Sequence, residues 1–296
     1  MTSVAVLAHA GKSLGGVLPE LRQILADEGV TDPLWFEVPK SKKAPEKVKK
    51  ALRAGADLLF IWGGDGMVQR CIDSLGAQKP AIAIIPAGTA NLLAKNLGIP
   101  RDIAEAVHIG LHGDQRFLDT GRVNGERFAV MAGVGIDALM IRDAGEGLKD
   151  RLGRVGYIVT GAKHLSDQRT RMTVGVEDAP WFKGEASCVL FGNVGKVLGG
   201  LTVFPDATPN DGRLEVGLVT AKGLTDWGRA LGRTMIGDPE GSPFVHAASG
   251  RWFDIRLDRK LPYELDGGER PPTKRLRVSI EPSSLAIRVP EEVTSE

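Results

Sequence analysis

The stretch Asp57-Leu58-Leu59-Phe60-Ile61-Trp62-Gly63-Gly64-Asp65-Gly66 decides the fold of this chain. Residues 58–62 form a wholly apolar run with the length of a strand that is buried on both faces. Apolar residues at helical spacing follow from Met67 to Leu75, which predicts a helix there. The glycines therefore lie between a buried strand and the N-terminus of a helix.

Such a junction suits an anionic ligand. Backbone N–H groups at a helix N-terminus have no partner within the helix, and glycines let phosphate oxygens come close to the backbone. The carboxylate of Asp65 would repel a phosphate. Asp65 could therefore assist a bound phosphate only through Mg²⁺ or a positioned water molecule. The alternative is a tight strand-to-helix turn in which Asp65 only caps the helix.

Two motifs carry a family resemblance. Gly63-Gly64-Asp65-Gly66 resembles the G-G-D-G-T signature that diacylglycerol kinases, sphingosine kinases, NAD kinases and phosphofructokinases share. The stretch Ile84-Ile85-Pro86-Ala87-Gly88-Thr89-Ala90-Asn91-Leu92-Leu93-Ala94-Lys95-Asn96-Leu97-Gly98-Ile99-Pro100 resembles the P-x-G-T-x-N-D-x-A-R-x-L-G-I-P segment of the diacylglycerol kinase catalytic family. The second match points to this family within the wider group.

The resemblance implies ATP and Mg²⁺ as cofactors. Asp65 would be a catalytic residue that organises the metal ion. The nucleotide would contact Gly63, Gly64, Asp65, Gly66, Met67, Gly88, Thr89 and Asn91. Two positions depart from the family pattern, because Met67 replaces the signature threonine and Leu92 replaces the aspartate after Asn91. Both changes remove polar groups near the nucleotide.

Gly11-Lys12-Ser13 follows the short apolar strand expected at Val4–Ala8. A Walker A loop would need a glycine five positions before Gly11, where Val6 stands. The G-x-S-x-G elbow of serine hydrolases also matches here, but nothing upstream could supply its preceding strands. The lipid kinases have N-P-x-S-G-K at this place, and the resemblance makes Gly11 and Lys12 phosphate contacts.

Residues 1–116 have the pattern of an α/β domain. Strands are expected at Leu34–Val38 and Ala81–Ile85, and helices alternate with the strands up to His112. This alternation predicts a parallel sheet, so both glycine turns should lie at the same carboxyl edge.

The sequence of residues 117–296 is typical of a mainly β domain. Together with the family resemblance, it predicts a β-sandwich. The expected strands are Phe117–Val123, Arg127–Val134, Met172–Val176, Ala186–Phe191, Leu214–Thr220, Phe253–Leu257, Leu276–Ile280 and Leu285–Val289. They are short and often β-branched, and turn sequences separate them. Leu148–Leu165 and Leu224–Met235 are expected to be helical, and the last segment could return to the first domain.

The resemblance continues into this half at two aspartates. Asp119 lies in a stretch similar to D-L-G-x-V-N-G-x-x-F and would join Asp65 in organising Mg²⁺, although a turn aspartate is the alternative. Asp211 lies in a stretch similar to D-D-G-x-L-D-V. There it would hold a structural Mg²⁺, with Thr208 and Arg213 lending backbone oxygens, and an ordinary Asx turn is the alternative.

The catalytic base is expected in Tyr263-Glu264-Leu265-Asp266-Gly267-Gly268-Glu269, which is similar to the family segment V-x-V-D-G-E. One extra glycine intervenes here. Glu269 takes the role of base if the turn is one residue longer. Otherwise Gly268 occupies that position and Asp266 is the nearest carboxylate.

The composition of the chain limits the kinds of binding partner and the cellular location that we expect. The 296 residues carry a formal net charge of +1, so no global attraction to nucleic acid is expected. Six lysines between Lys40 and Lys50 could face an acidic membrane surface, or could be a solvated helix face. Cys71 and Cys188 are surrounded by apolar residues and read as reduced core cysteines. No apolar run could span a bilayer and no signal peptide is evident, which favours the cytoplasm, with peripheral contact to the membrane.

His108 and His112 stand at helical spacing and could share a metal ion. No third ligand lies nearby in the sequence, so an exposed helix face is the expectation.

These observations predict an ATP-dependent lipid kinase that transfers the γ-phosphate to a lipid hydroxyl, on diacylglycerol or a related lipid at the membrane surface. An NAD kinase-like enzyme is the nearest enzymatic alternative. A nucleotide- and lipid-binding module without catalysis is a second alternative, motivated by Met67, Leu92 and Gly268. The sequence leaves the oligomeric state open, a homodimer included.

Overall fold

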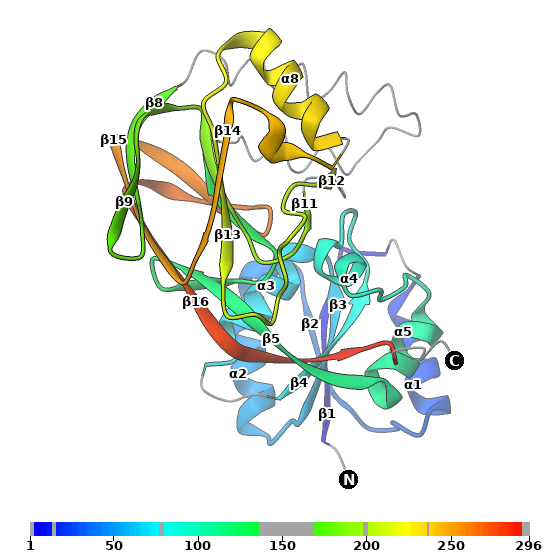
Figure 1. Cartoon of the computed structure of the whole chain (residues 1–296). Coiled ribbons are helices and arrows are strands. Elements are labelled where there is room, and N and C mark those ends of the chain that lie inside the picture. The colour runs from blue at the N-terminus through cyan, green and yellow to red at the C-terminus, as the bar shows by residue number, and fades with distance from the viewer. Residues whose placement is uncertain are drawn as a thin grey trace. The chain divides into compact units, whose positions relative to one another are not determined.

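The structure is a computed structural model that describes residues 3–13, 16–76, 80–135, 169–197, 201–235 and 237–291. The chain forms two compact units (Figure 1). Unit 1 comprises Met1–Leu118 together with Ser283–Glu296, and unit 2 comprises Asp119–Pro282. The last segment of the chain therefore belongs to the first unit.

Unit 1 is built on a parallel sheet. Its strands are β1 (Val4–His9), β2 (Leu34–Val38), β3 (Leu58–Gly63) and β4 (Ala81–Pro86). They lie in the order β2-β1-β3-β4, and the end of β16 (Gly268–Val289) pairs with β4 through Ile287 and Ile82, also in parallel. All residues of β3 and β4 are buried, which explains why their sequences are continuous apolar runs.

Helices cover both faces of this sheet. They are α1 (Leu18–Asp27), the short 3-10 helix η1 (Ser41–Lys43), α2 (Ala44–Arg53), α3 (Asp65–Ser74), α4 (Leu92–Asn96) and α5 (Ile103–His112). Helix α1 packs with α5, and α2 packs with α3, on opposite sides of the strands (Figure 1). Gly110 lets α5 approach the sheet closely, because a Cβ atom there would lie 2.3 Å from the Phe60 ring.

Unit 2 is a β-rich, sandwich-like domain. Its strands are β5 (Asp114–Val123, which begins in unit 1), β6 (Glu126–Phe128), β7 (Met131–Val134), β8 (Thr170–Val176), β9 (Ala179–Ala186), β10 (Cys188–Gly192), β11 (Lys196–Val197), β12 (Leu201–Thr202), β13 (Leu214–Val219), β14 (Val245–Gly250), β15 (Trp252–Leu265) and most of β16. The order β14-β13-β10-β7-β15-β16 is antiparallel, and β8 joins β15 to β9. The predicted fold class is confirmed.

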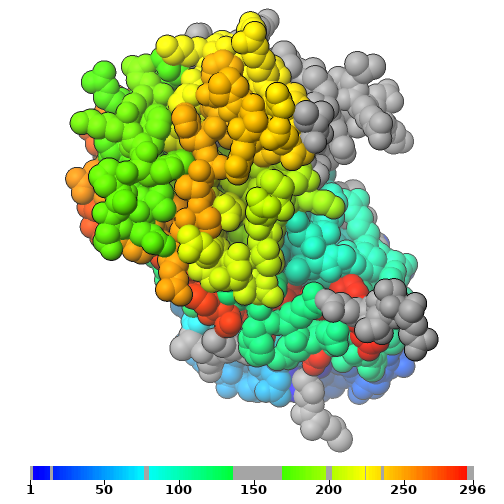
Figure 2. All heavy atoms as spheres, viewed as in Figure 1, coloured from blue at the N-terminus to red at the C-terminus, as the bar shows by residue number. Residues whose placement is uncertain are grey.

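The larger apolar core of unit 2 has Phe128, Phe191 and Phe253 among its largest members, and a smaller cluster joins Trp227 of the helix that follows β13 to Cys188 and Ala221. Helix α8 (Gly223–Met235) and the 3-10 helix η3 (Pro239–Gly241) lie outside the larger core. In the space-filling view α8 and the segment from η3 to β14 form one continuous surface (Figure 2).

Several strand predictions needed correction. The strand expected at Arg127–Val134 divides into β6 and β7, because the N–H groups of residues 129–131 bond the Asp266 carboxylate. The two strands expected between Leu276 and Val289 are one continuous strand, β16. Strands β9 and β14 were not predicted. The helix expected at Leu148–Leu165 lies outside the described residues.

Candidate functional site

The carboxyl edge of the unit 1 sheet gathers the predicted nucleotide residues. Strand β1 lies between β2 and β3, so the direction of the crossovers reverses between β1 and β3. Ligands of open parallel sheets bind at such a reversal, outside the carboxyl ends of the strands. Gly11 and Lys12 follow β1, and Gly64–Gly66 follow β3. The topology thus places both segments at the expected crevice.

The two glycine turns touch each other. A Cβ atom at Gly64 would lie 3.0 Å from the Gly88 Cα atom, and one at Gly88 would lie 2.4 Å from the Gly64 Cα atom. Both glycines are therefore required by the contact between the turns themselves. This contact explains glycine at both positions, and the role of Gly64 in phosphate binding stays a prediction.

Gly66 has the open space that phosphate oxygens would need. No atom lies within 4 Å of a Cβ atom built at Gly66, and the residue is exposed in the first turn of α3. Met67, in contrast, turns its side chain inward and is 2% exposed. A Cβ atom at Gly63 would lie 2.6 Å from the Met67 Cβ atom, so these two residues pack together. The N–H of Met67 donates to the Gly64 carbonyl at 2.8 Å, so neither its side chain nor its N–H group is free for a ligand.

Asp65 is the first residue of α3, and Gly64 is the N-cap. The Oδ1 atom of Asp65 accepts a hydrogen bond from the Leu92 N–H at 2.5 Å, at the start of α4. Burial raises the pKa of the Asp65 carboxyl, and backbone N–H groups, led by that of Leu92, oppose the rise. Asp65 thus caps the neighbouring helix α4 and joins the two glycine turns.

The second glycine turn is closed by Asn91. Its Oδ1 atom accepts the Gly88 N–H at 3.0 Å, and its Nδ2 atom donates to the Gly88 carbonyl at 2.7 Å. Asn91 has a φ of 49° and is 3% exposed. Its amide therefore shapes the turn, in which Thr89 is half-buried.

Two side chains at this edge were not predicted from the sequence. Arg101 donates through Nη2 to the Thr89 carbonyl at 2.5 Å, which holds an exposed guanidinium beside the second turn. His9 accepts the Gly11 N–H at Nδ1, at 3.2 Å, and burial and the Lys12 charge lower its pKa. The Lys12 carbonyl accepts the Trp62 indole N–H at 2.8 Å. The place of His9 at the end of β1 was the only available signal, and Arg101, which lies between α4 and α5, had none.

In unit 2, Asp266 is committed to the fold. Its carboxylate accepts three backbone N–H groups, from Ala129 at 2.8 Å and from Val130 and Met131 at 2.9 Å each. Asp266 is 4% exposed, and its own N–H donates to the Met131 carbonyl at 2.9 Å. This carboxylate is a poor candidate for a base, because abstracting a proton would break contacts that position β7.

The register of the β15–β16 hairpin fixes the length of the turn. Leu265 pairs with Gly268 and Glu264 pairs with Glu269, so only Asp266 and Gly267 form the tip. Both tip residues have positive φ, as a two-residue Asp-Gly hairpin requires. The longer turn is therefore not formed, and Gly268 is the first ladder position. Glu269 is exposed on the same face of the hairpin as the buried Glu264.

Arg270 holds this hairpin in place. Its guanidinium forms a two-pronged ion pair with Glu126, at 2.7 Å and 2.5 Å, and also donates to the Gly268 carbonyl at 2.8 Å. Arg270 is 7% exposed and the Glu126 side chain 21%, so the pair is largely shielded from solvent on the arginine side. The backbone that presents Glu269 is consequently well anchored.

Asp119 is hydrogen-bonded to the loop around Asp211, which is predicted to hold a structural metal ion. Its Oδ2 atom accepts the Gly212 N–H at 2.7 Å, and its N–H donates to the Pro209 carbonyl at 2.7 Å. Asp211 forms the expected Asx turn by accepting the Arg213 N–H at 2.9 Å. The Thr208 carbonyl accepts the Asn210 N–H at 2.8 Å. The partnership of Asp119 with Asp65 stays a prediction.

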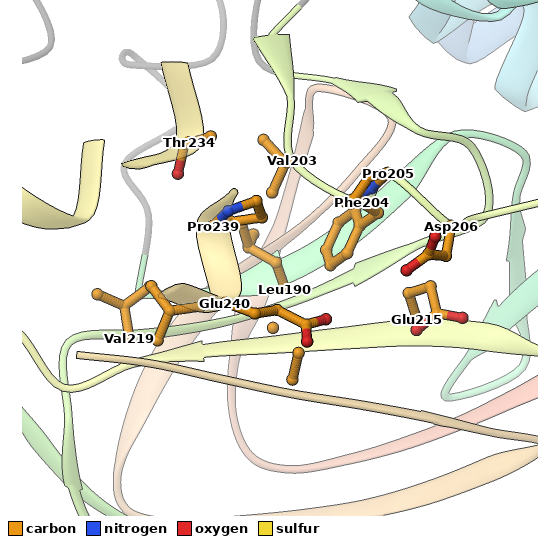
Figure 3. A pocket seen from close by; sticks show the side chains of 13 residues that line it. Leu190, Val203, Phe204, Pro205, Asp206, Glu215, Val219, Thr234, Pro239 and Glu240 are labelled. Carbon is orange, nitrogen blue, oxygen red and sulfur yellow. The ribbon is translucent and has the colours of Figure 1, made fainter. Parts of the chain in front are cut away.

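Unit 2 also contains an apolar pocket of about 60 Å³. Its wall includes Leu190, Val203 and Phe204, and Asp206 and Glu215 lie together at one end (Figure 3). Burial raises the pKa of the Glu215 carboxyl, and the charges of Asp211 and Asp206 add to the rise. Glu240 also lines the pocket (Figure 3), and an apolar slot with carboxylates in its lining suits part of an amphiphilic molecule.

Among the described residues, no helix is both long enough and apolar enough to cross a membrane.

Two family models together match nearly all of the chain. Residues 4–123 match the diacylglycerol kinase catalytic domain, and residues 130–289 match the YegS C-terminal NAD kinase beta sandwich-like domain. The chain is 30% identical over 293 residues to a probable lipid kinase YegS-like protein of Enterobacter sp. (strain 638), covering 97% of this chain and 96% of the relative. The chain is also 30% identical over 293 residues to the lipid kinase YegS of Escherichia coli (strain K12), again covering 97% of this chain and 96% of the relative.

Solved structures show the same fold. A crystal structure of a putative diacylglycerol kinase from Bacillus anthracis has a TM-score of 0.77 at 19% identity, over 97% of this chain and 96% of that one. The crystal structure of an NAD kinase from Archaeoglobus fulgidus in complex with ATP has a TM-score of 0.53 at 10% identity. This match covers 97% of this chain and 93% of that one.

Proposed function

Because the chain belongs to the YegS-like lipid kinase family, we propose that it transfers the γ-phosphate of ATP to the hydroxyl group of diacylglycerol or a related lipid. The observation that carries the proposal is the joined pair of glycine turns at the carboxyl edge of the unit 1 sheet. Asp65 links these turns, and Gly66 leaves open space beside it.

ATP phosphates would rest on the first turn of α3. The N-terminus of this ten-residue helix offers backbone N–H groups and the positive end of its dipole. Two exposed cationic side chains add to this site, Lys12 after β1 and Arg101, which lies between α4 and α5 and donates to the second turn. The wider predicted contact set is Gly11, Lys12, Gly63, Gly64, Asp65, Gly66, Met67, Gly88, Thr89 and Asn91.

Asp65 would hold Mg²⁺ at this edge. A carboxylate oxygen is the ligand that Mg²⁺ prefers, and the ion would neutralise charge on the transferred phosphoryl group. The neighbouring N–H groups orient the Asp65 carboxylate, so little reorganisation is needed when the cation binds. Burial opposes an isolated negative charge at Asp65, and a bound cation would relieve that cost.

In the transfer step the lipid hydroxyl oxygen forms a bond to the γ-phosphorus while the bond to the bridging oxygen of ADP breaks. The short hairpin turn places Gly268 where the family pattern has its base, so we assign the base by exposure instead of by register. The hydroxyl proton would pass to Glu269. Among the carboxylates of the hairpin, Glu269 is exposed while Asp266 is sealed by three N–H groups. The anchored backbone around Arg270 would keep Glu269 positioned for this role.

The loop around Asp211 would hold a structural Mg²⁺. The Thr208 carbonyl accepts the Asn210 N–H, the Pro209 carbonyl accepts the Asp119 N–H, and Asp211 forms the Asx turn with Arg213, so the loop is already ordered. Asp211 would supply the carboxylate, with Thr208 and Arg213 lending carbonyl oxygens and Asp119 fixing the loop through Gly212. Such an ion would stabilise the loop and would take no part in the transfer.

The acceptor lipid would be met at a membrane surface. The lysines of η1 and α2 are mostly exposed, and only Lys50 of these forms a described ion pair, with Glu46. Juxtaposed lysines attract anionic lipid. The apolar pocket of Figure 3 would take a short part of the lipid, with its polar end at Asp206 and Glu215.

The test is product analysis after incubation with ATP labelled at the γ-phosphate, Mg²⁺, a total lipid extract and NAD together. We expect the label in the lipid phase and none in NADP. Label in NADP would favour an NAD kinase-like enzyme. No labelled product of either kind would favour a module that binds nucleotide and lipid without catalysis.

A further inference from the structure

Three side chains with metal-binding atoms meet where α1 and α5 pack together. In the part of the chain that the structure describes, Glu28, His108 and His112 form the single group of at least three His, Cys, Asp or Glu residues close enough to share an ion. Glu28 is the C-cap of α1, and the histidines are one turn apart on α5. All three belong to unit 1, and none contributes to the glycine turns.

The distances within this group are close to those of a coordinated ion. The Nε2 atom of His112 lies 3.1 Å from Oε2 of Glu28, and the Nδ1 atom of His108 lies 3.7 Å from Oε1. The three ligand atoms lie within 4.8 Å of one another. Tetrahedral Zn²⁺ with bonds of 2.0–2.1 Å separates its ligand atoms by about 3.3 Å. Small side-chain rotations would therefore complete the geometry.

A hydrogen bond between helices is the simpler explanation for the His112–Glu28 contact. It does not account for His108, whose ring centroid lies 4.8 Å from that of His112 and whose Nδ1 faces the other oxygen of the same carboxylate. The side chains of the two histidines are 64% and 53% exposed. An ion could reach them directly from solvent.

The ligand set selects the class of metal. Two imidazoles and one carboxylate suit Zn²⁺, Cu²⁺ or Ni²⁺, whereas Mg²⁺ prefers an all-oxygen shell. We propose that Glu28, His108 and His112 bind a divalent transition metal ion, with Zn²⁺ as the representative case. The ion would join the end of α1 to α5, and the site is independent of the proposed phosphoryl transfer.

Calorimetric titration of the metal-free full chain with zinc chloride, without Mg²⁺ or nucleotide, tests the proposal. We expect one binding event that His108→Asn, His112→Asn and Glu28→Gln each weaken at least tenfold, since even the outer partners of metal ligands are worth about 10- to 100-fold in affinity. His246→Asn is the matched control, because His246 is exposed in unit 2 and should leave zinc affinity unchanged.

Unfolding by denaturant supplies a readout that does not depend on kinase activity. Zinc should stabilise the parent and His246→Asn proteins as mass action requires, and should not stabilise the variant that carries both His108→Asn and His112→Asn. The replaced side chains reach solvent, so these variants should fold. Equal zinc affinity in the parent and the double variant, or no zinc binding by the parent, would overturn the proposal.

Discussion

Two Asp-Gly turns, one in each unit, use the same pair of residues in different ways. Asp65-Gly66 opens helix α3, and Asp266-Gly267 forms the tip of the β15–β16 hairpin. Both carboxylates accept backbone N–H groups from another segment of their own unit. Asp65 also interacts with several backbone N–H groups, led by that of Leu92, but it remains half-buried beside the open space at Gly66. Asp266 is 4% exposed and accepts three N–H groups.

This difference shows that an aspartate in a glycine turn does not by itself identify a catalytic residue. A carboxylate can bind a metal ion only if part of it stays accessible, and one that is sealed among backbone donors stabilises the fold instead. Asp65 is expected to affect mainly catalysis, and Asp266 is expected to affect mainly stability.

The largest expected effect belongs to Asp65→Asn. Losing the carboxylate that would organise Mg²⁺ should slow lipid phosphorylation by about 10³-fold, since metal ions supply several kcal/mol to such transfers. The Mg²⁺ dependence should also shift to higher concentration. Stability should fall less than in Asp266→Asn, because Asp65 is only half-buried and the amide oxygen of the new side chain can still accept the Leu92 N–H.

Initial rates measured over a series of Mg²⁺ concentrations check this prediction. Asp73→Asn is the matched control, since it removes one negative charge from the same helix α3 away from the glycine turns. A parental rate for Asp65→Asn at every Mg²⁺ concentration would separate Asp65 from the chemistry.

Asp266→Asn should act on the fold of unit 2. An amide cannot accept all three N–H groups, because its NH₂ would face at least one of them. The free energy of unfolding should fall by about 3 kcal/mol, as expected when a buried, charged hydrogen-bond network is broken. Denaturant titration measures the change.

The two cysteines report which unit has loosened. Both are fully buried, Cys71 in α3 and Cys188 in β10, and burial raises the pKa of Cys188 to about 12, so neither should react in the folded protein. In Asp266→Asn, thiol labelling followed by peptide mass spectrometry should rise at Cys188 more than at Cys71. Faster labelling of Cys71 alone would contradict the assignment.

Glu269→Gln should slow transfer by about 10²-fold, at the low end of the range for a lost general base. ATP affinity should stay unchanged, because the base would contact only the acceptor hydroxyl. Glu264→Gln is the companion variant, since Glu264 stands directly across the hairpin. If Glu264→Gln is slow and Glu269→Gln transfers at the parental rate, the base is the buried carboxylate.

Gly66→Val should weaken ATP binding by about tenfold, or 1.4 kcal/mol, because the new side chain would fill the open space at the phosphate turn. Gly228→Val is the control, as Gly228 is also helical, exposed and free of close neighbours, but lies in α8. Calorimetry with Mg-ATP compares the two. Gly64→Val is unsuitable, because it would push into Gly88.

Local patterns predicted much of the fold and of the glycine-turn site. The continuous apolar runs of β3 and β4 and the helix after Asp65 could be predicted because burial on both faces and helical spacing are visible in the sequence. The long-range contacts could not. The contact of Gly64 with Gly88, the use of Asp266 by residues 129–131, and the approach of Glu28 to His112 all join distant segments. Glu28 lies 84 residues before His112, which is why no third ligand for that histidine pair was visible nearby in the sequence.

The most direct test of the account measures lipid phosphorylation by Asp65→Asn and Asp266→Asn, each normalised to the fraction of folded protein. We predict that folded Asp266→Asn works within a few-fold of the parental rate, while folded Asp65→Asn is slower by about 10³-fold. A stably folded but inactive Asp266→Asn, together with an active Asp65→Asn, would contradict the division of roles between the two turns.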